Sequence, residues 1–97
     1  MMKKKIALLG STGSIGTQAL EVVLQHPDLF EVEVLTANNN STLLIEQAKK
    51  FKPNTVVISN KEKYNDVNDA LHPLNIKVFA GEESLVDIVE GENINLV

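Results

Sequence analysis

Apolar and polar positions in the first third of the chain follow two different periods. Residues 6–9 form a short continuous apolar run, which is typical of a central parallel strand covered on both faces. From Ile15 to Gln25 the apolar residues recur at helical spacing, and Pro27 ends the pattern. Residues 30–36 alternate apolar with charged side chains, which predicts a strand with one partly solvated face. The chain therefore opens with a strand, a helix and a second strand.

The alternation of strands and helices continues beyond this unit. Leu44, Ala48 and Phe51 share one face of a second predicted helix, which Pro53 ends. Such an order predicts a parallel sheet with helices on both faces, because parallel neighbours need long right-handed crossovers. The remaining predicted elements are a strand at 55–59, a weaker helix at 61–71, a strand at 76–80, a helix at 82–89 and the opening of a strand at 94–97.

This order of elements predicts an α/β fold, a Rossmann-type doubly wound parallel sheet with the strand order 3-2-1-4-5. The fifth strand, which begins at Ile94, would then lie beside the fourth. Because the sequence stops at Val97, inside this strand, we expect a sheet that is incomplete at its C-terminal end. We also expect the exposed strand edge to make the chain self-associate or be marginally stable. The expected unit is one truncated domain, residues 1–97, of a longer protein.

Three of the five glycines stand between the first strand and the first helix, in the segment GSTGSIG. In this context Gly10 permits a tight turn, Gly13 lets a pyrophosphate approach the backbone, and Gly16 lets helix and strand pack closely. The N–H groups of the first helical turn attract an anion, and Thr12 and Ser14 add hydroxyl donors. The alternative is a turn that binds nothing, but strand, helix and spacing together favour a phosphate site.

The loop after the second strand decides which dinucleotide is expected. An NAD site places Asp or Glu there, about 20 residues beyond the glycines, to bind the ribose 2′-hydroxyl. Here the loop holds Asn38, Asn39 and Asn40 and no carboxylate, which favours NADP over NAD. No Lys or Arg lies in the loop, since Lys49 and Lys50 stand near the far end of the second helix. A plain turn that tolerates left-handed backbone geometry is an equally open interpretation.

Composition narrows the class of protein. The net charge of -4, with no basic cluster beyond residues 3–5, disfavours a nucleic acid partner. Without cysteine there is no disulfide, thiolate metal site or Cys nucleophile. The N-terminal apolar run is shorter than the roughly 7–15 residues of a secretory signal, and no segment is long enough to span a bilayer. We therefore expect a cytoplasmic protein without a membrane partner.

No grouping of side chains predicts catalysis or metal binding within the chain. His26 and His72 stand far apart, each before a proline, and neither has a partner at metal-ligand spacing. Tyr64 is followed four residues later by Asn68 rather than by the lysine of short-chain dehydrogenases. We therefore predict no catalytic residues and no metal ligands in this chain.

The segments LLGSTGSIG, LTANNN and LLIEQAKKFKP together resemble the N-terminal part of the 1-deoxy-D-xylulose 5-phosphate reductoisomerase family, over essentially the whole chain. The resemblance implies an NADPH-dependent parent enzyme of isoprenoid biosynthesis, which isomerises and reduces 1-deoxy-D-xylulose 5-phosphate to 2-C-methyl-D-erythritol 4-phosphate. It also implies a divalent metal (Mg or Mn) and a homodimer in the parent. Residues 1–97 would be its truncated N-terminal NADP-binding domain, inactive alone because the catalytic and C-terminal domains are absent.

The resemblance further implies which residues hold the cofactor. In the family the glycine turn holds the NADPH phosphates, and the loop after the second strand contacts the adenosine 2′-phosphate. The family's frequent Gly-Lys-Asn in that loop is Asn-Asn-Asn here, so the lysine is replaced by an amide. The corresponding positions are Thr12, Gly13, Ser14 and Ile15 in the turn and Asn38, Asn39 and Asn40 in the loop.

Two other functions remain open from the sequence. One is the cofactor domain of a different NADP-dependent oxidoreductase, of the aspartate semialdehyde dehydrogenase type. The other is a non-catalytic nucleotide-sensing module. The sequence that follows residue 97 in the parent gene distinguishes the first from a reductoisomerase, and the length of the open reading frame distinguishes the second.

Overall fold

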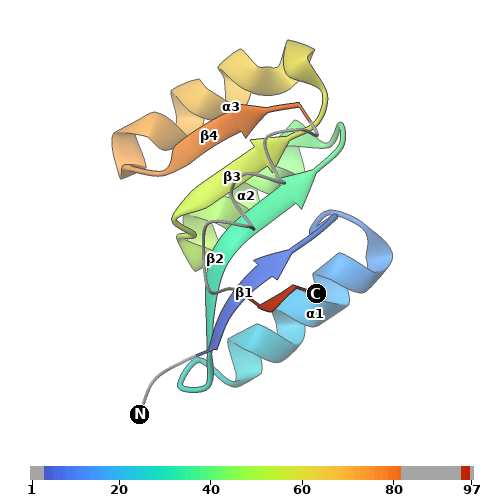
Figure 1. The fold of residues 1–97 in the computed structure, drawn as a ribbon, viewed down its shortest axis with the longest axis vertical. Coiled ribbons are helices and arrows are strands. Elements are labelled where there is room, and N and C mark those ends of the chain that lie inside the picture. Colours follow the sequence, from blue (N-terminus) through green and yellow to red (C-terminus); the bar gives the residue numbers. More distant parts are fainter. Residues whose placement is uncertain (1–3, 82–94, 97) are drawn as a thin grey trace.

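The computed structural model describes residues 4–81 and 95–96 of the chain (Figure 1). Strands and helices alternate as predicted, with shifts of one or two residues at their ends. The helix predicted at 61–71 is divided into a 3-10 turn and an α-helix, and the helix predicted at 82–89 lies outside the described residues. The elements are β1 Lys4–Leu8, α1 Ser14–Gln25, β2 Phe30–Ala37, α2 Ser41–Phe51, β3 Thr55–Ile58, η1 Lys61–Lys63, α3 Tyr64–Leu71, η2 His72–Leu74, β4 Lys77–Ala80 and β5 Asn95–Leu96.

The described strands form one parallel sheet in the order β4-β3-β2-β1-β5. The α/β class and the doubly wound parallel sheet are confirmed, since the chain winds from β1 in both directions. The predicted order 3-2-1-4-5 is wrong, because β4 pairs with β3 and β5 pairs with β1. The alternation of strands and helices is the same in both orders, so the pattern did not distinguish them.

The packing of α3 explains why β4 pairs with β3. Val67 and Leu71 are the buried residues of α3, and they belong to the same hydrophobic cluster as Val56 of β3 and Val78 of β4. These two valines are also paired in the register of the two strands. The side chains of α3 therefore extend the core past β3 in the direction already taken by α2.

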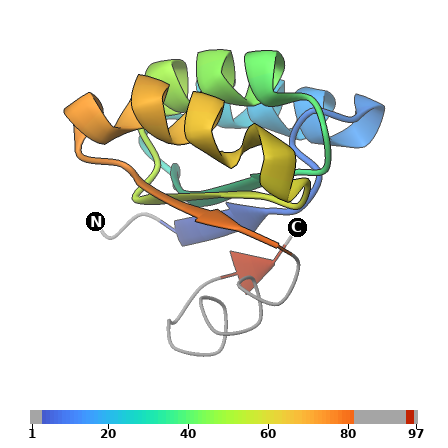
Figure 2. The same cartoon turned by 90° about the horizontal axis from the view of Figure 1, so that it is seen from above.

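The helices α1, α2 and α3 all cover one face of the sheet (Figure 2). The prediction of helices on both faces is therefore not met by the described helices. The reason is handedness, because successive right-handed crossovers that step in one direction place their helices on the same face. The steps from β1 to β2, β3 and β4 all run in one direction.

The core lies between the sheet and these helices. All four residues of β3 are buried, as a central strand requires, and in β2 the residues from Val34 to Ala37 are buried while Glu31 is exposed. The partly solvated face predicted for the second strand is thus confined to its first half. The buried cluster consists of Leu8, Leu20, Val32, Leu35, Ala37, Leu44, Ala48, Val56, Ile58, Val67, Leu71, Ile76 and Val78.

Leu44 provides a test of this core, since it is fully buried on α2. We expect Leu44→Ala to lower the free energy of unfolding by about 2–5 kcal/mol, because the cavity adds to the lost transfer energy. The volume-conserving Leu44→Met should cost less than about 1.5 kcal/mol. Urea denaturation of both variants measures the difference. Equal midpoints for wild type and Leu44→Ala would contradict the assigned core.

Candidate functional site

The glycine turn and the asparagine loop lie at the same edge of the sheet (Figure 1). The turn follows β1 and leads into α1, and the loop follows β2 and leads into α2. In open parallel sheets, ligands bind outside the carboxyl ends of the strands, where the strand order reverses. Here the order reverses at β1, between β2 on one side and β5 on the other. The turn therefore stands at the position where this fold places a ligand.

The backbone of the turn confirms the roles predicted for two of its glycines. Gly10 has a φ of +68°, in the left-handed region that favours glycine. A Cβ on Gly16 would stand 2.7 Å from the Cα of Ser11 and closer still to the carbonyl oxygen of Gly10. Gly16 therefore lets α1 pack directly on the turn.

Gly13 is different, because the fold itself does not require glycine there. Its φ of -81° suits any residue, and an added Cβ would meet only the Gly10 carbonyl oxygen, at 3.5 Å. The Gly13 N–H donates to that same oxygen over 3.1 Å and closes the turn. A side chain at this exposed position would extend into the space beside the helix terminus. The fold does not explain why position 13 is glycine, whereas the predicted approach of a ligand to the backbone would explain it. That approach remains a prediction.

The N-terminus of α1 is suited to an anion. Gly13 is its N-cap and provides no side-chain hydrogen bond, and the first turn contains no acidic residue. The N–H groups of Ser14 and Ile15 precede the first backbone bond of the helix, which runs from Thr17 to Gly13. Neither a cap nor a carboxylate therefore competes with a ligand for the positive end of the helix dipole.

The four predicted residues of the turn form one continuous rim around this helix terminus. Thr12 is half-buried, and Gly13 and Ser14 are exposed. Ile15 is 81% exposed. The rim thus combines two hydroxyl groups, backbone N–H groups and one apolar side chain.

Buried and partly buried hydrogen bonds hold the turn in place. Ser11 is fully buried, and its Oγ donates to Gln47 Oε1 over 2.7 Å while Gln47 Nε2 donates back to the Ser11 carbonyl oxygen over 2.8 Å. From β2, the Thr36 carbonyl oxygen accepts from Ser11 N at 2.8 Å, and Thr36 Oγ1 accepts from Gly10 N at 2.9 Å. The turn is therefore fixed by β2, through Thr36, and by α2, through Gln47.

Ser11, Thr36 and Gln47 are positioning residues that were not predicted from the sequence. The available signal was Gln47, a polar residue on the helical face that also carries Leu44 and Ala48. A buried amide needs hydrogen-bond partners, so its place on an apolar face indicates a polar contact with another element.

The three asparagines of the loop have separate roles. Asn40 is the N-cap of α2, and its Oδ1 accepts from Leu43 N over 3.2 Å. Asn39 Oδ1 accepts from Asn60 Nδ2 over 2.9 Å, and the Asn38 carbonyl oxygen accepts from Asn60 N over 2.9 Å. None of the three asparagines adopts the left-handed geometry that the plain-turn interpretation allows, and the binding role of the loop stays a prediction. Among the described residues, the positive φ values outside glycine belong to Lys52 and Asn75.

Asn60 is a further positioning residue that was not predicted from the sequence. It follows β3 and precedes η1, whose first residue, Lys61, is exposed. The carboxyl ends of neighbouring parallel strands meet at one edge, so the residues after β3 were bound to lie beside the loop after β2. Lys61 is thus a basic residue next in sequence to the partner of Asn39, whereas Lys49 and Lys50 occupy the last turn of α2, as expected.

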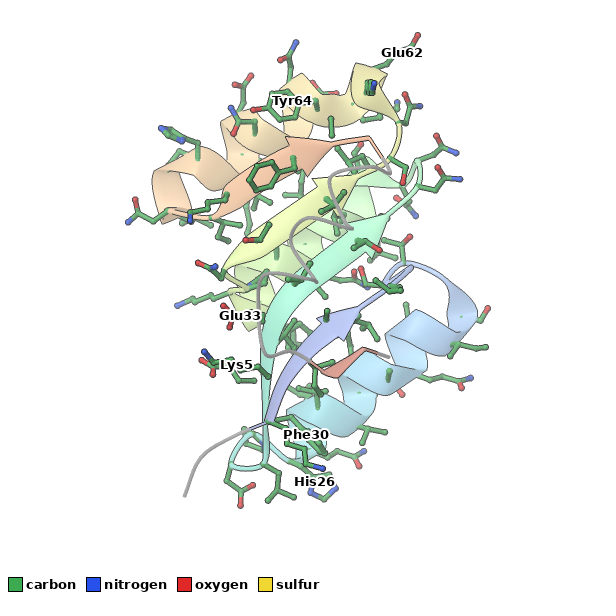
Figure 3. All side chains as sticks on the ribbon, in the orientation of Figure 1. Lys5, His26, Phe30, Glu33, Glu62 and Tyr64 are labelled. Carbon is green, nitrogen blue, oxygen red and sulfur yellow. The ribbon has the colours of Figure 1, made fainter. Side chains whose placement is uncertain are left out.

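Two further findings concern the described part of the chain. Within residues 4–81 and 95–96, no helix has both the length and the apolar character needed to cross a membrane. In the same residues, no three His, Asp or Glu side chains gather into a metal-binding group. His26 is the C-cap of α1 and lies at the end of that helix away from the turn (Figure 3).

Comparison with known proteins gives one consistent result. The profile of the 1-deoxy-D-xylulose 5-phosphate reductoisomerase family matches residues 6–97. The reductoisomerase of Phocaeicola vulgatus is 59% identical over 96 residues, which cover 99% of this chain and 25% of the relative. That of Porphyromonas gingivalis is 53% identical over 96 residues, with the same coverage. The chain thus spans about a quarter of the length of these relatives.

Solved reductoisomerases have the same fold over this segment. The enzyme from Zymomonas mobilis in complex with NADPH superposes with a TM-score of 0.84 at 34% identity, over 89% of this chain and 23% of that chain. A reductoisomerase in complex with NADPH, fosmidomycin and magnesium superposes with a TM-score of 0.88 at 26% identity, over 96% of this chain and 23% of that chain.

The two glycines on either side of the helix terminus give a matched test of the turn. We expect Gly16→Ala to lower the free energy of unfolding by about 1–3 kcal/mol, because its Cβ overlaps backbone atoms that cannot move away independently. Gly13→Ala should change it by less than about 1 kcal/mol, since that position is open. Thermal or urea unfolding measures both, and equal losses would contradict the close packing of α1 on the turn.

Proposed function

The chain belongs to the 1-deoxy-D-xylulose 5-phosphate reductoisomerase family, and on this premise we propose that it is the N-terminal NADPH-binding part of such an enzyme. One observation carries the proposal. The helix terminus at the reversal of strand order has neither a side-chain cap nor an acidic residue in its first turn, and a glycine turn leaves the space in front of it open. A related enzyme that superposes on this chain is known in complex with NADPH.

The residues of the turn fit a pyrophosphate. Backbone N–H groups at Ser14 and Ile15 and the hydroxyl groups of Thr12 and Ser14 are donors, and phosphate oxygens accept. Gly13 keeps the front of the helix terminus clear of a side chain. In this proposal the turn binds and orients the two central phosphates of the cofactor.

The loop after β2 is proposed to bind the adenosine ribose and its 2′-phosphate. It reaches the turn through Thr36, which hydrogen-bonds to both Gly10 and Ser11 and stands two residues before Asn38. The loop contains no carboxylate that would repel a phosphate. The proposed residues are Asn38, Asn39 and Asn40.

For the whole enzyme we propose the activity that the family resemblance implies. It would isomerise 1-deoxy-D-xylulose 5-phosphate and reduce the product to 2-C-methyl-D-erythritol 4-phosphate in isoprenoid biosynthesis, as a cytoplasmic homodimer. The bound NADPH supplies the hydride for the reduction. We place the divalent metal, the sugar phosphate and the catalytic groups in parts of the enzyme outside this chain, so the chain alone binds the cofactor without turnover.

The two alternatives are not favoured. A semialdehyde dehydrogenase is a different family from the one whose profile matches residues 6–97. A nucleotide-sensing module would bind the same cofactor, and sequencing of the reading frame beyond residue 97 would identify it by the lack of a catalytic domain.

Binding at the turn is tested by Gly13→Val. The branched side chain would occupy the space that the pyrophosphate needs, so we expect NADPH to bind at least about tenfold more weakly, or about 1.4 kcal/mol. Calorimetry on both proteins measures the affinity, and circular dichroism checks that the variant is folded. Equal affinities would remove the turn from the binding site.

Cofactor preference is tested by titration with NADPH and NADH. We expect NADPH to bind more tightly by roughly 1.5–3 kcal/mol, the value of one charge-assisted hydrogen bond. Tighter binding of NADH would overturn the assignment of the Asn38–Asn40 loop to the 2′-phosphate.

A further inference from the structure

Asn60 connects the segment after β3 to the loop after β2 through both its backbone and its side chain. Its N–H donates to the Asn38 carbonyl oxygen, and its Nδ2 donates to Asn39 Oδ1, both over 2.9 Å. Its Oδ1 accepts from the backbone N–H of Glu62 over 3.0 Å. Figure 3 shows Glu62 at the end of the fold where η1 begins, and only its backbone takes part in this contact.

These contacts determine which way the Asn39 amide faces. A backbone N–H can only donate, so Asn60 must direct its oxygen toward Glu62 and its NH₂ group toward Asn39. An NH₂ group also only donates, so Asn39 must direct its oxygen toward Asn60. The NH₂ group of Asn39 therefore faces away from Asn60, and this orientation is set by the peptide group of Glu62.

Asn40 is oriented by the same rule. Its Oδ1 accepts from the backbone N–H of Leu43, so its NH₂ group also faces away from the helix terminus that it caps. Two neighbouring amides of the loop thus use their oxygens on protein donors. Their NH₂ groups are the parts left to meet a ligand.

We propose that Asn60 is a specificity-determining residue for the 2′-phosphate of NADP, acting as a positioning residue through Asn39. The proposal rests on the proposed function of the loop. Phosphate oxygens only accept hydrogen bonds, whereas a ribose 2′-hydroxyl both donates and accepts. An Asn39 amide held with its NH₂ group outward suits the phosphate, and the same amide turned around would suit the hydroxyl of NAD. Through this contact the uncharged Asn39 would take over part of the role of the lysine that the family frequently has at position 39.

The test is Asn60→Asp, which changes the orientation of Asn39 while keeping the contact to Glu62. A carboxylate still accepts from the Glu62 N–H, but it also accepts from Asn39, whose oxygen must then face outward. We expect NADPH to bind about tenfold more weakly or worse, with NADH affinity changed less than about threefold. Calorimetry on the chain measures both cofactors.

Two control variants separate orientation from charge and from folding. Thr42→Asp adds the same charge to the exposed first turn of α2, at a residue that is not part of the Asn39–Asn60 hydrogen bond, and should weaken NADPH binding less than Asn60→Asp does. Asn60→Ser keeps an acceptor for the Glu62 N–H but releases Asn39, and should lose an intermediate part of the NADPH preference. Asn60→Ser also remains informative if Asn60→Asp does not fold.

The outcomes distinguish the inference from the proposed function. Equal weakening by Asn60→Asp and Thr42→Asp would show that charge alone matters, and parallel losses for NADPH and NADH would show a merely structural role; both overturn the inference. If the wild-type chain binds NADPH tightly and Asn60→Ser shows the same preference for NADPH over NADH, the inference is overturned and the proposed function is left intact. A wild-type chain that binds neither cofactor overturns both.

Discussion

The reciprocal hydrogen bonds between Ser11 and Gln47 are the interaction on which the candidate site depends. Both residues are buried, so each polar group must find a partner within the protein, and the two bonds satisfy them together. Because Gln47 lies on α2 and Ser11 on the turn after β1, the pair holds elements that the sequence separates by 36 residues. The turn, the N-terminus of α1 and the loop after β2 therefore form one unit.

Much of the fold follows from the sequence because periodicity is a local property. The continuous run before Gly10 and the helical spacing after Ile15 each depend on neighbouring residues, and both elements are present as predicted. The strand order was wrong because the choice of partner for β4 depends on how α3 packs, through Val67 and Leu71, beside α2. The pattern of neighbouring residues does not predict which strand pairs with β4.

In the candidate site, too, some residue roles could be predicted from the sequence and others could not. The roles of Gly10 and Gly16 were predictable, since each follows from the geometry of a strand that turns directly into a helix. The roles of Gln47 and Asn60 were not, because their partners lie far away in sequence and are brought near only by the parallel arrangement of the strands. The loop shows the limit most clearly. Three identical asparagines proved to have three different sets of contacts, which composition alone cannot distinguish.

The close approach of Gly16 to the backbone of Gly10 and Ser11 has a consequence for the thermodynamics of recognition. Since α1 rests directly on the turn, the direction of the helix axis and the positions of its terminal N–H groups are set when the chain folds. The conformational entropy of this segment is thus lost during folding and not when a ligand arrives. In the proposed function, this preorganised turn would bind a phosphate without an ordering step, although its own residues carry no charge.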